Sequence, residues 1–220
     1  MGSGLDSILR VQELGLLDYE VASKLQLKTL NEVADGSLPP TLMVLQHPPV
    51  YTVGRSRGAE SNLLAVGDVP VIHVRRGGDV TFHGPGQLVV YPIIPLKPPH
   101  QDIHKHMWRL EQAAIDTCEH FGLKGLRDER NTGVWVGGRK ICAIGVAAKR
   151  WVTWHGLAMN VTTDTSYFQR INPCGMDAGL VTTMSSELTN PPTMRQVSER
   201  LIHDLQKAFQ EVLGGGGKLG

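Results

Sequence analysis

The chain has 220 residues, of which 41% are hydrophobic and 20% charged, an ordinary composition for a globular protein. Its 22 Lys and Arg residues nearly balance 21 Asp and Glu residues, so the net charge of +1 argues against nucleic acid as a partner. No apolar run approaches the ~20 residues that span a bilayer, so we expect no membrane segment.

The first half of the chain predicts one helix and several strands. A helix is expected over 19–30 and short apolar strands over Thr41–Gln46 and Val50–Val53. The polar segment 54–62 is typical of a loop, and 69–74 indicates a further strand.

The second half predicts more strands between two long helices. Strands are expected over 87–94, Gly133–Val136, 140–147 and 154–161, the middle pair joined by a tight Gly-Gly turn. Helical spacing of apolar residues predicts a helix over 103–121. The last helix, over 193–213, opens with a capping-box pattern at Thr193 and Gln196.

Strands outnumber helices and adjoin through short turns. This arrangement favours an α+β fold with mixed or antiparallel sheets and flanking helices. The length suits one domain, which we place at 1–213, followed by a flexible glycine-rich tail at 214–220.

A glycine-rich segment at 75–93 is the most unusual part of the sequence. Its glycines permit positive φ angles and bring backbone N–H groups close to a ligand. The alternative is a plain hairpin turn, but Arg76, Thr81, His83 and Gln87 in the same cluster favour a binding loop.

The three cysteines differ in setting, and their spacing fits no zinc pattern, so no metal is expected. Cys118 falls on the apolar face of the 103–121 helix, which predicts a core residue. Cys174 lies between proline and glycine, which predicts a presented thiol, and it is favoured as a nucleophile over the ambiguous Cys142. Unpaired cysteines fit a reducing compartment: the cytoplasm or, alternatively, a mitochondrial or plastid matrix.

A thiol needs a cation or base beside it to attack at neutral pH. The candidates in this sequence are Lys140, Lys149, His83 and His155. Lys140 stands out because it follows a turn and enters an apolar strand, which predicts that its ammonium lies near buried surface.

Several ordered motifs resemble one family. The segments LGLLDYEVASKLQ, QHPPVYTVGR, RGGDVTFHGPGQLVVYPI, GVWVGGRKICAIGV, WHGLAMNV and NPCGM are similar to blocks of the lipoate-protein ligase B family, the octanoyltransferases. They occur in the family's order between about 14 and 188, which is far more specific than any single glycine pattern.

The resemblance implies the catalytic-domain fold of biotin- and lipoate-protein ligases. It implies transfer of an octanoyl group from octanoyl-acyl carrier protein to a lysine of lipoyl domains, without cofactor. The implied acceptors are lipoyl domains of 2-oxoacid dehydrogenase acyltransferase subunits and the glycine-cleavage carrier protein.

The same resemblance assigns residues. Cys174 takes the place of the acyl-thioester cysteine and Lys140 that of the lysine that lowers its pKa. The implied acyl-binding residues are Arg76, Gly77, Gly78, Asp79, Val80, Thr81, Phe82, His83, Ala143, Ile144, Gly145, Gly156, Leu157 and Ala158. Asn172 departs from the family's more frequent valine before the Pro-Cys pair.

The residues alone do not exclude three other functions. An ATP-dependent lipoate or biotin ligase would have a similar glycine-rich segment. A cysteine hydrolase would pair Cys174 with His83 or His155. A non-catalytic module would bind an acyl chain without reacting with it.

Overall fold

The computed structural model describes residues 9–172 and 178–214, and within them the strands form two sheets. The larger sheet contains, in spatial order, β1 (Arg10–Leu16), β2 (Thr41–Gln46), β6 (Gln87–Ile93), β9 (Val152–Asn160), β8 (Arg139–Lys149) and β7 (Gly133–Val136). The smaller one contains β4 (Val71–His73), β3 (Val50–Val53) and β5 (Val80–His83). One pair in each sheet, β1–β2 and β3–β4, is parallel and the rest are antiparallel. The predicted α+β class with mixed sheets is confirmed.

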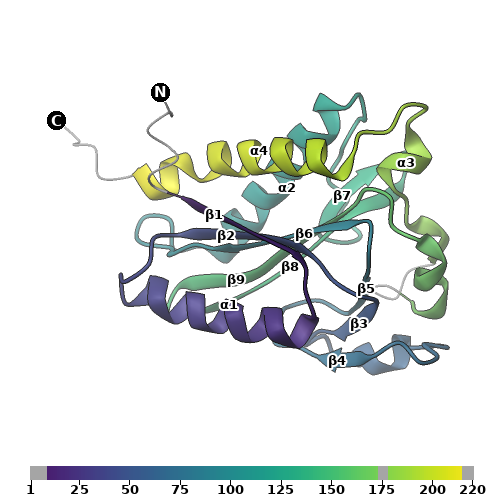
Figure 1. Ribbon diagram of the computed structural model, residues 1–220, viewed down its shortest axis with the longest axis horizontal. Helices are drawn as coiled ribbons and strands as arrows, with labels where there is room; N and C mark the ends of the chain where they lie inside the picture. The colour runs from purple at the N-terminus through teal and green to yellow at the C-terminus, as the bar shows by residue number, and fades with distance from the viewer. Residues whose placement is uncertain (1–8, 173–177, 215–220) are drawn as a thin grey trace.

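Helices cover both faces of the larger sheet. Helix α1 (Tyr19–Ala34) lies on one face, while α2 (Ile103–His120) and α4 (Met194–Gly214) pack together on the other (Figure 1). The smaller sheet lies on the α1 side. Shorter elements complete the described chain: the 3₁₀ helices η1 (Ala59–Asn62), η2 (Thr165–Arg170) and η4 (Ala178–Leu180), and α3 (Met184–Glu187). None of the helices in the described ranges is both long and apolar enough to cross a membrane.

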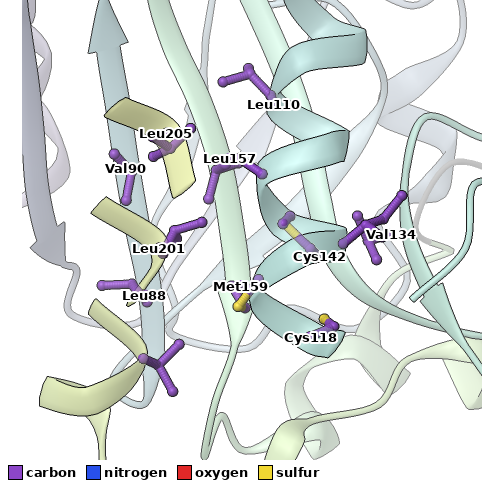
Figure 2. Close-up of a cluster of buried hydrophobic side chains, with 14 of the residues drawn as sticks. Leu88, Val90, Leu110, Cys118, Val134, Cys142, Leu157, Met159, Leu201 and Leu205 are labelled. Atoms are coloured by element: carbon purple, nitrogen blue, oxygen red, sulfur yellow. The ribbon is translucent and has the colours of Figure 1, made fainter. Parts of the chain in front are cut away.

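The main hydrophobic core fills the space between the larger sheet and the α2–α4 pair. Figure 2 shows Leu201 and Leu205 of α4 facing Leu157 and Met159 of β9 across this core. The apolar periodicity of α2 and α4 places one face of each helix here, where burial of each large side chain contributes about 1.5–3 kcal/mol.

Two of the three cysteines belong to that core. Cys118 is fully buried on α2, as its helical position predicts, and Cys142 is fully buried on β8 (Figure 2). Burial raises the pKa of the Cys118 thiol to about 12 and raises that of Cys142 further. Both are therefore protonated and inert at neutral pH.

Local signals set several element boundaries as predicted. Gly137 and Gly138 both have positive φ in the β7–β8 turn. The capping box opens α4: Thr193 N–H donates to Gln196 Oε1 at 2.9 Å and Gln196 N–H donates to Thr193 Oγ1 at 3.3 Å. Both pairs satisfy groups that would otherwise be orphaned at the start of the helix.

Two strands were not predicted. β1 is an edge strand with a bulge between Glu13 and Gly15, which interrupts the alternation that sequence patterns rely on. β5 lies within the segment 75–93, for which the sequence favours a binding loop, yet its four residues pair with β3. The predicted 69–74 strand is shorter, Val71–His73, and the predicted 19–30 helix runs on to Ala34.

Candidate active site

A cavity of about 590 Å³ opens between strands β8 and β9 of the larger sheet and the segment 76–83. Its size lies within the range of small-molecule sites in proteins. All the predicted acyl-binding residues except Phe82 line it, as does Lys140: Arg76, Gly77, Gly78, Asp79, Val80, Thr81, His83, Ala143, Ile144, Gly145, Gly156, Leu157 and Ala158. Segments far apart in the sequence thus meet at one site.

Phe82 is the exception among these residues. It is 1% exposed, and its ring stacks on that of Tyr167 with centroids 4.4 Å apart, inside the core of the smaller sheet. Alternation along β5 explains this, because Phe82 points to the opposite face from Thr81 and His83.

Small side chains form one wall of the cavity. On neighbouring strands, Ala143 of β8 pairs with Ala158 of β9, and Gly145 pairs with Gly156. Cross-strand partners point to the same face of a sheet, so the short side chains of Ala143 and Ala158 leave a trough there. The glycines have another role: a Cβ on Gly145 would meet Arg76, and one on Gly156 would collide with the Val90 carbonyl, so their absence of a side chain lets these segments pack closely. The segment 76–83 is tied to this wall by Gly77 N–H, which donates to Val146 O at 3.0 Å.

Arg76 is buried at the side of the trough. Its Nη2 donates to the carbonyl and the hydroxyl of Thr52, each at 2.9 Å, and its Nη1 donates to Gly77 O at 3.0 Å. The guanidinium therefore holds the loop against the smaller sheet. It also contributes to lowering the pKa values of His83 and His155.

His83 is part of a buried hydrogen-bond chain. Gln87 Nε2 donates to Phe82 O at 3.1 Å and to Asn160 Oδ1 at 3.0 Å, so Gln87 Oε1 faces His83 and accepts from its Nδ1 at 2.7 Å. Burial, and then the neighbouring His47, lowers the pKa of His83 well below its ordinary value. His83 is thus a neutral imidazole at neutral pH.

His155 lies in the cavity wall with a left-handed backbone, φ 56°. It is 2% exposed, and neither ring nitrogen has a hydrogen-bond partner among the described residues. Burial, with a smaller contribution from Arg76, lowers its pKa to about 3. Like His83, it supplies no positive charge to a thiol at pH 7.

Lys140 enters the cavity from the start of β8 and is 8% exposed. Its Nζ donates to Asn131 Oδ1 at 2.6 Å and lies 5.6 Å from the centroid of the Trp135 ring. Trp135 Nε1 in turn donates to Asn131 O at 3.2 Å, which fixes the 126–132 loop beside the lysine. The predicted burial of the Lys140 side chain is therefore confirmed.

Gly133 makes room for the Lys140 side chain. Its φ is +141°, and a Cβ on this residue would come within 2.5 Å of Lys140 Cε and collide with the Cys142 carbonyl. Lys149, the other candidate lysine, is exposed at the far end of β8. The two lysines are nine positions apart, which is about 30 Å along an extended strand, so they cannot serve one site.

Cys174 lies in the segment 173–177, outside the described residues, but both flanks of that segment adjoin the cavity. Before it, Asn172 N–H donates to Asn62 O at 2.8 Å, and Asn62 Nδ2 donates to the carboxylate of the cavity residue Asp79 at 2.8 Å. After it, Val181 pairs with Lys140, and Thr182 N–H donates to Lys140 O at 3.0 Å.

Sequence reasoning missed an aromatic and imidazole cluster beside His83. Tyr19, at the start of α1, stacks near His83 with centroids 5.9 Å apart. His47 Nδ1 donates to Leu17 O at 2.7 Å, so its Nε2 accepts from Tyr91 OH at 2.8 Å. Tyr19 and Tyr91 line the cavity although neither was singled out, since a tyrosine in a helix start or an apolar strand predicts only core.

Over residues 9–172 and 178–214, no group of three or more His, Cys, Asp or Glu side chains is arranged to hold a metal ion.

The sequence of this chain is similar to known proteins over most of its length. Residues 18–206 match the model of a family described as the lipoyl protein ligase A/B catalytic domain. A protein named octanoyltransferase from Thermoanaerobacter sp. is 42% identical over 90% of this chain and 89% of its own length.

Solved structures share the fold at much lower identity. A bipartite lipoate protein ligase from Thermoplasma acidophilum superposes with a TM-score of 0.66 at 17% identity, covering 93% of this chain and 83% of that one. The biotin protein ligase from Aquifex aeolicus has a TM-score of 0.52 at 9% identity, covering 91% of this chain and 68% of that one. The predicted similarity to the biotin and lipoate ligase catalytic domain is confirmed.

Proposed function

Because this chain belongs to the lipoyl protein ligase A/B catalytic-domain family, we propose that it moves an octanoyl group from octanoyl-acyl carrier protein to a lysine of lipoyl domains. The chain is an octanoyltransferase, as its 42% identity to proteins of that name over 90% of its length indicates. We propose that residues 1–213 make up its one catalytic domain and that it acts in the cytoplasm; α4 ends at Gly214.

The proposed mechanism is supported by the position of Lys140. The small-residue trough and the buried Lys140 belong to the same cavity, and the chain on either side of the 173–177 segment is held there. An acyl chain lying in the trough would therefore bring its carbonyl toward Lys140 and Cys174.

The first half-reaction forms an acyl-enzyme. The Cys174 thiolate attacks the donor carbonyl, the bond to the carrier sulfur breaks, and the octanoyl group is left on Cys174 as a thioester. One thioester replaces another, so the free-energy change is small. The leaving thiolate takes up a proton, for which the Lys140 ammonium is the nearest proposed donor.

The second half-reaction forms the amide. The neutral amine of the acceptor lysine attacks the Cys174 thioester, and the carbon–sulfur bond breaks to regenerate the Cys174 thiolate. The attacking nitrogen gives its extra proton to the Lys140 amine, which the first half-reaction left neutral, so the ammonium is restored. Conversion of a thioester to an amide is downhill, so the reaction needs neither ATP nor a metal. Backbone N–H groups of the glycine-rich segment are proposed to stabilise the oxyanion.

Intact-protein mass spectrometry tests the proposal. Mixing the protein with octanoyl-acyl carrier protein, with chelator and without ATP, should add one octanoyl group that survives denaturation. Adding a lipoyl domain should then move that mass to the acceptor.

Each rival function predicts another result in that experiment. A ligase would need ATP and free octanoate, and a hydrolase would release free acid without the acceptor. A non-catalytic acyl-binding module would lose the acyl group on denaturation.

The trough predicts which acyl chains fit. Ala143→Leu adds a branched side chain where the acyl methylenes are proposed to lie, so kcat/KM for the octanoyl donor should fall at least about tenfold. A butanoyl donor should lose much less, because its chain ends earlier in the trough. Parallel assays with donors of both lengths check this.

Ala148→Leu is the matched control, since Ala148 lies on the same strand but is exposed and outside the cavity. Equal losses for both donors in Ala143→Leu would show that the trough does not hold the chain.

A further inference from the structure

Asn131 makes a hydrogen bond directly to the side chain of Lys140 inside the cavity. The Lys140 Nζ donates to Asn131 Oδ1 at 2.6 Å, and both residues line the cavity. An ammonium carries three donors and no acceptor, so the oxygen of the amide, and not its nitrogen, faces the lysine. A neutral amide therefore contacts the lysine that we propose as the activator of Cys174.

The backbone of Asn131 is fixed on both sides, which sets where its side chain begins. Its carbonyl accepts from Trp135 Nε1 at 3.2 Å, and its N–H donates to Asp128 O at 3.3 Å. Two positions further along, Gly133 N–H donates to Glu111 Oε1 of α2 at 3.0 Å. Because Trp135 is buried, the segment that carries the amide is anchored to the core of the protein.

Three ion pairs lie on the segments that pack around Lys140. They are Asp128 with Arg130 at 2.6 Å, Glu111 with Arg127 at 3.1 Å, and Glu187 with Arg139 at 2.7 Å. Glu129, which also lines the cavity, is exposed to solvent. Each of the three paired carboxylates thus has its own cation, whereas the Asn131 amide that contacts the Lys140 Nζ carries no charge.

The proposed transfer requires Lys140 in two protonation states. As an ammonium it gives a proton to the leaving carrier thiolate, and as a neutral amine it takes the proton of the attacking nitrogen. An amide has both an acceptor oxygen and a donor NH₂ group, so by rotating it can bond either state of the lysine. A carboxylate has acceptors only, and its negative charge would keep the proton on the lysine.

We propose that Asn131 is a positioning residue for Lys140, and that its neutral amide keeps the lysine nitrogen in the cavity through both protonation states. This rests on the proposed octanoyl transfer. Asn131 does not react itself and acts only through the position and charge of Lys140. Because the amide is neutral, it leaves the full charge of the ammonium to act on the Cys174 thiolate.

The test exchanges the amide for a carboxylate of the same shape. In Asn131→Asp the backbone bonds of the loop remain, but the new negative charge offsets that of Lys140. The pH profile of Cys174 alkylation by iodoacetamide should therefore move up by about one unit. The kcat for transfer from octanoyl-acyl carrier protein should fall at least about tenfold, with little change in the donor KM, because the lysine no longer exchanges its proton.

Two further variants separate this role from a structural one. Asn131→Gln retains an amide and should keep much more of the transfer rate than Asn131→Asp. Asn131→Ala should move the alkylation profile up when Lys140 is present and leave it unchanged in Lys140→Ala, since the amide then has no lysine to position. Asn190→Asp is the control and should behave as the wild type, because it makes the same change at an exposed position outside the cavity.

Two results would overturn the inference. An Asn131→Asp protein with the wild-type alkylation profile and transfer rate would reduce Asn131 to a loop residue. A shift by Asn131→Ala that is as large without Lys140 as with it would show that the amide does not act through the lysine. The Gln and Ala variants decide the question should Asn131→Asp fail to fold.

Alkylation needs no acyl substrate, so failure of the inference can be told from failure of the proposed function. A wild-type protein that forms no acyl-enzyme with octanoyl-acyl carrier protein would refute the proposed function, whatever the alkylation profiles of the Asn131 variants.

Discussion

Replacing Cys174 by alanine should abolish both the acyl-enzyme and transfer to the lipoyl domain. Without the sulfur the donor carbonyl has no nucleophile, and loss of a covalent nucleophile costs on the order of a thousandfold or more in rate. Mass spectrometry after mixing with the octanoyl donor should find no added octanoyl group on the Cys174→Ala protein. Transfer assays should show no product above background.

The other two cysteines are the matched controls. Cys118 and Cys142 are fully buried, and burial raises the pKa of both thiols, so neither is expected to react. Cys118→Ala and Cys142→Ala remove a buried sulfur and should lower the unfolding temperature while keeping transfer. Transfer at the wild-type rate by Cys174→Ala would refute the covalent mechanism.

Replacing Lys140 by alanine should make Cys174 react only at higher pH. An ammonium within about 4–6 Å stabilises a thiolate and lowers its pKa by a unit or more, so its removal raises that pKa. The pH profile of iodoacetamide alkylation should therefore move up by at least about one unit. At pH 7 the rate should drop about tenfold, because one unit corresponds to about 1.4 kcal/mol.

Lys140→Arg separates charge from proton transfer. Arginine keeps the cation but does not give up its proton, so much of the reactivity toward iodoacetamide should remain while transfer to the acceptor stays impaired. Lys149→Ala is the control, since that lysine is exposed and outside the cavity. An unchanged alkylation profile in Lys140→Ala would leave Cys174 without its proposed activator. His83 and His155 would be poor substitutes, because burial lowers the pKa of each.

Local sequence determined most of the helices and strands, and it also predicted the burial of two side chains. The glycine turn between β7 and β8, the capping box of α4 and the apolar face of α2 depend on neighbours within a few residues, which is the range that sequence patterns describe. The burial of Cys118 and of Lys140 followed from the same local patterns. The family resemblance supplied the proposed roles of Cys174 and Lys140.

Only the tertiary structure decided which of these residues meet. The trough exists because β8 and β9 pair in a register that puts Ala143 opposite Ala158. The absence of a side chain at Gly156 lets β6 approach, since a Cβ there would collide with the Val90 carbonyl. The neutral states of His83 and His155 depend on desolvation by segments distant in sequence, which no local pattern encodes. The loops 54–57 and 75–78 likewise meet only in the fold, through a backbone hydrogen bond from Arg55 to Arg76, twenty-one positions along the chain. Register, burial and long-range pairing are properties of the packed chain, and they turned separate motifs into one cavity.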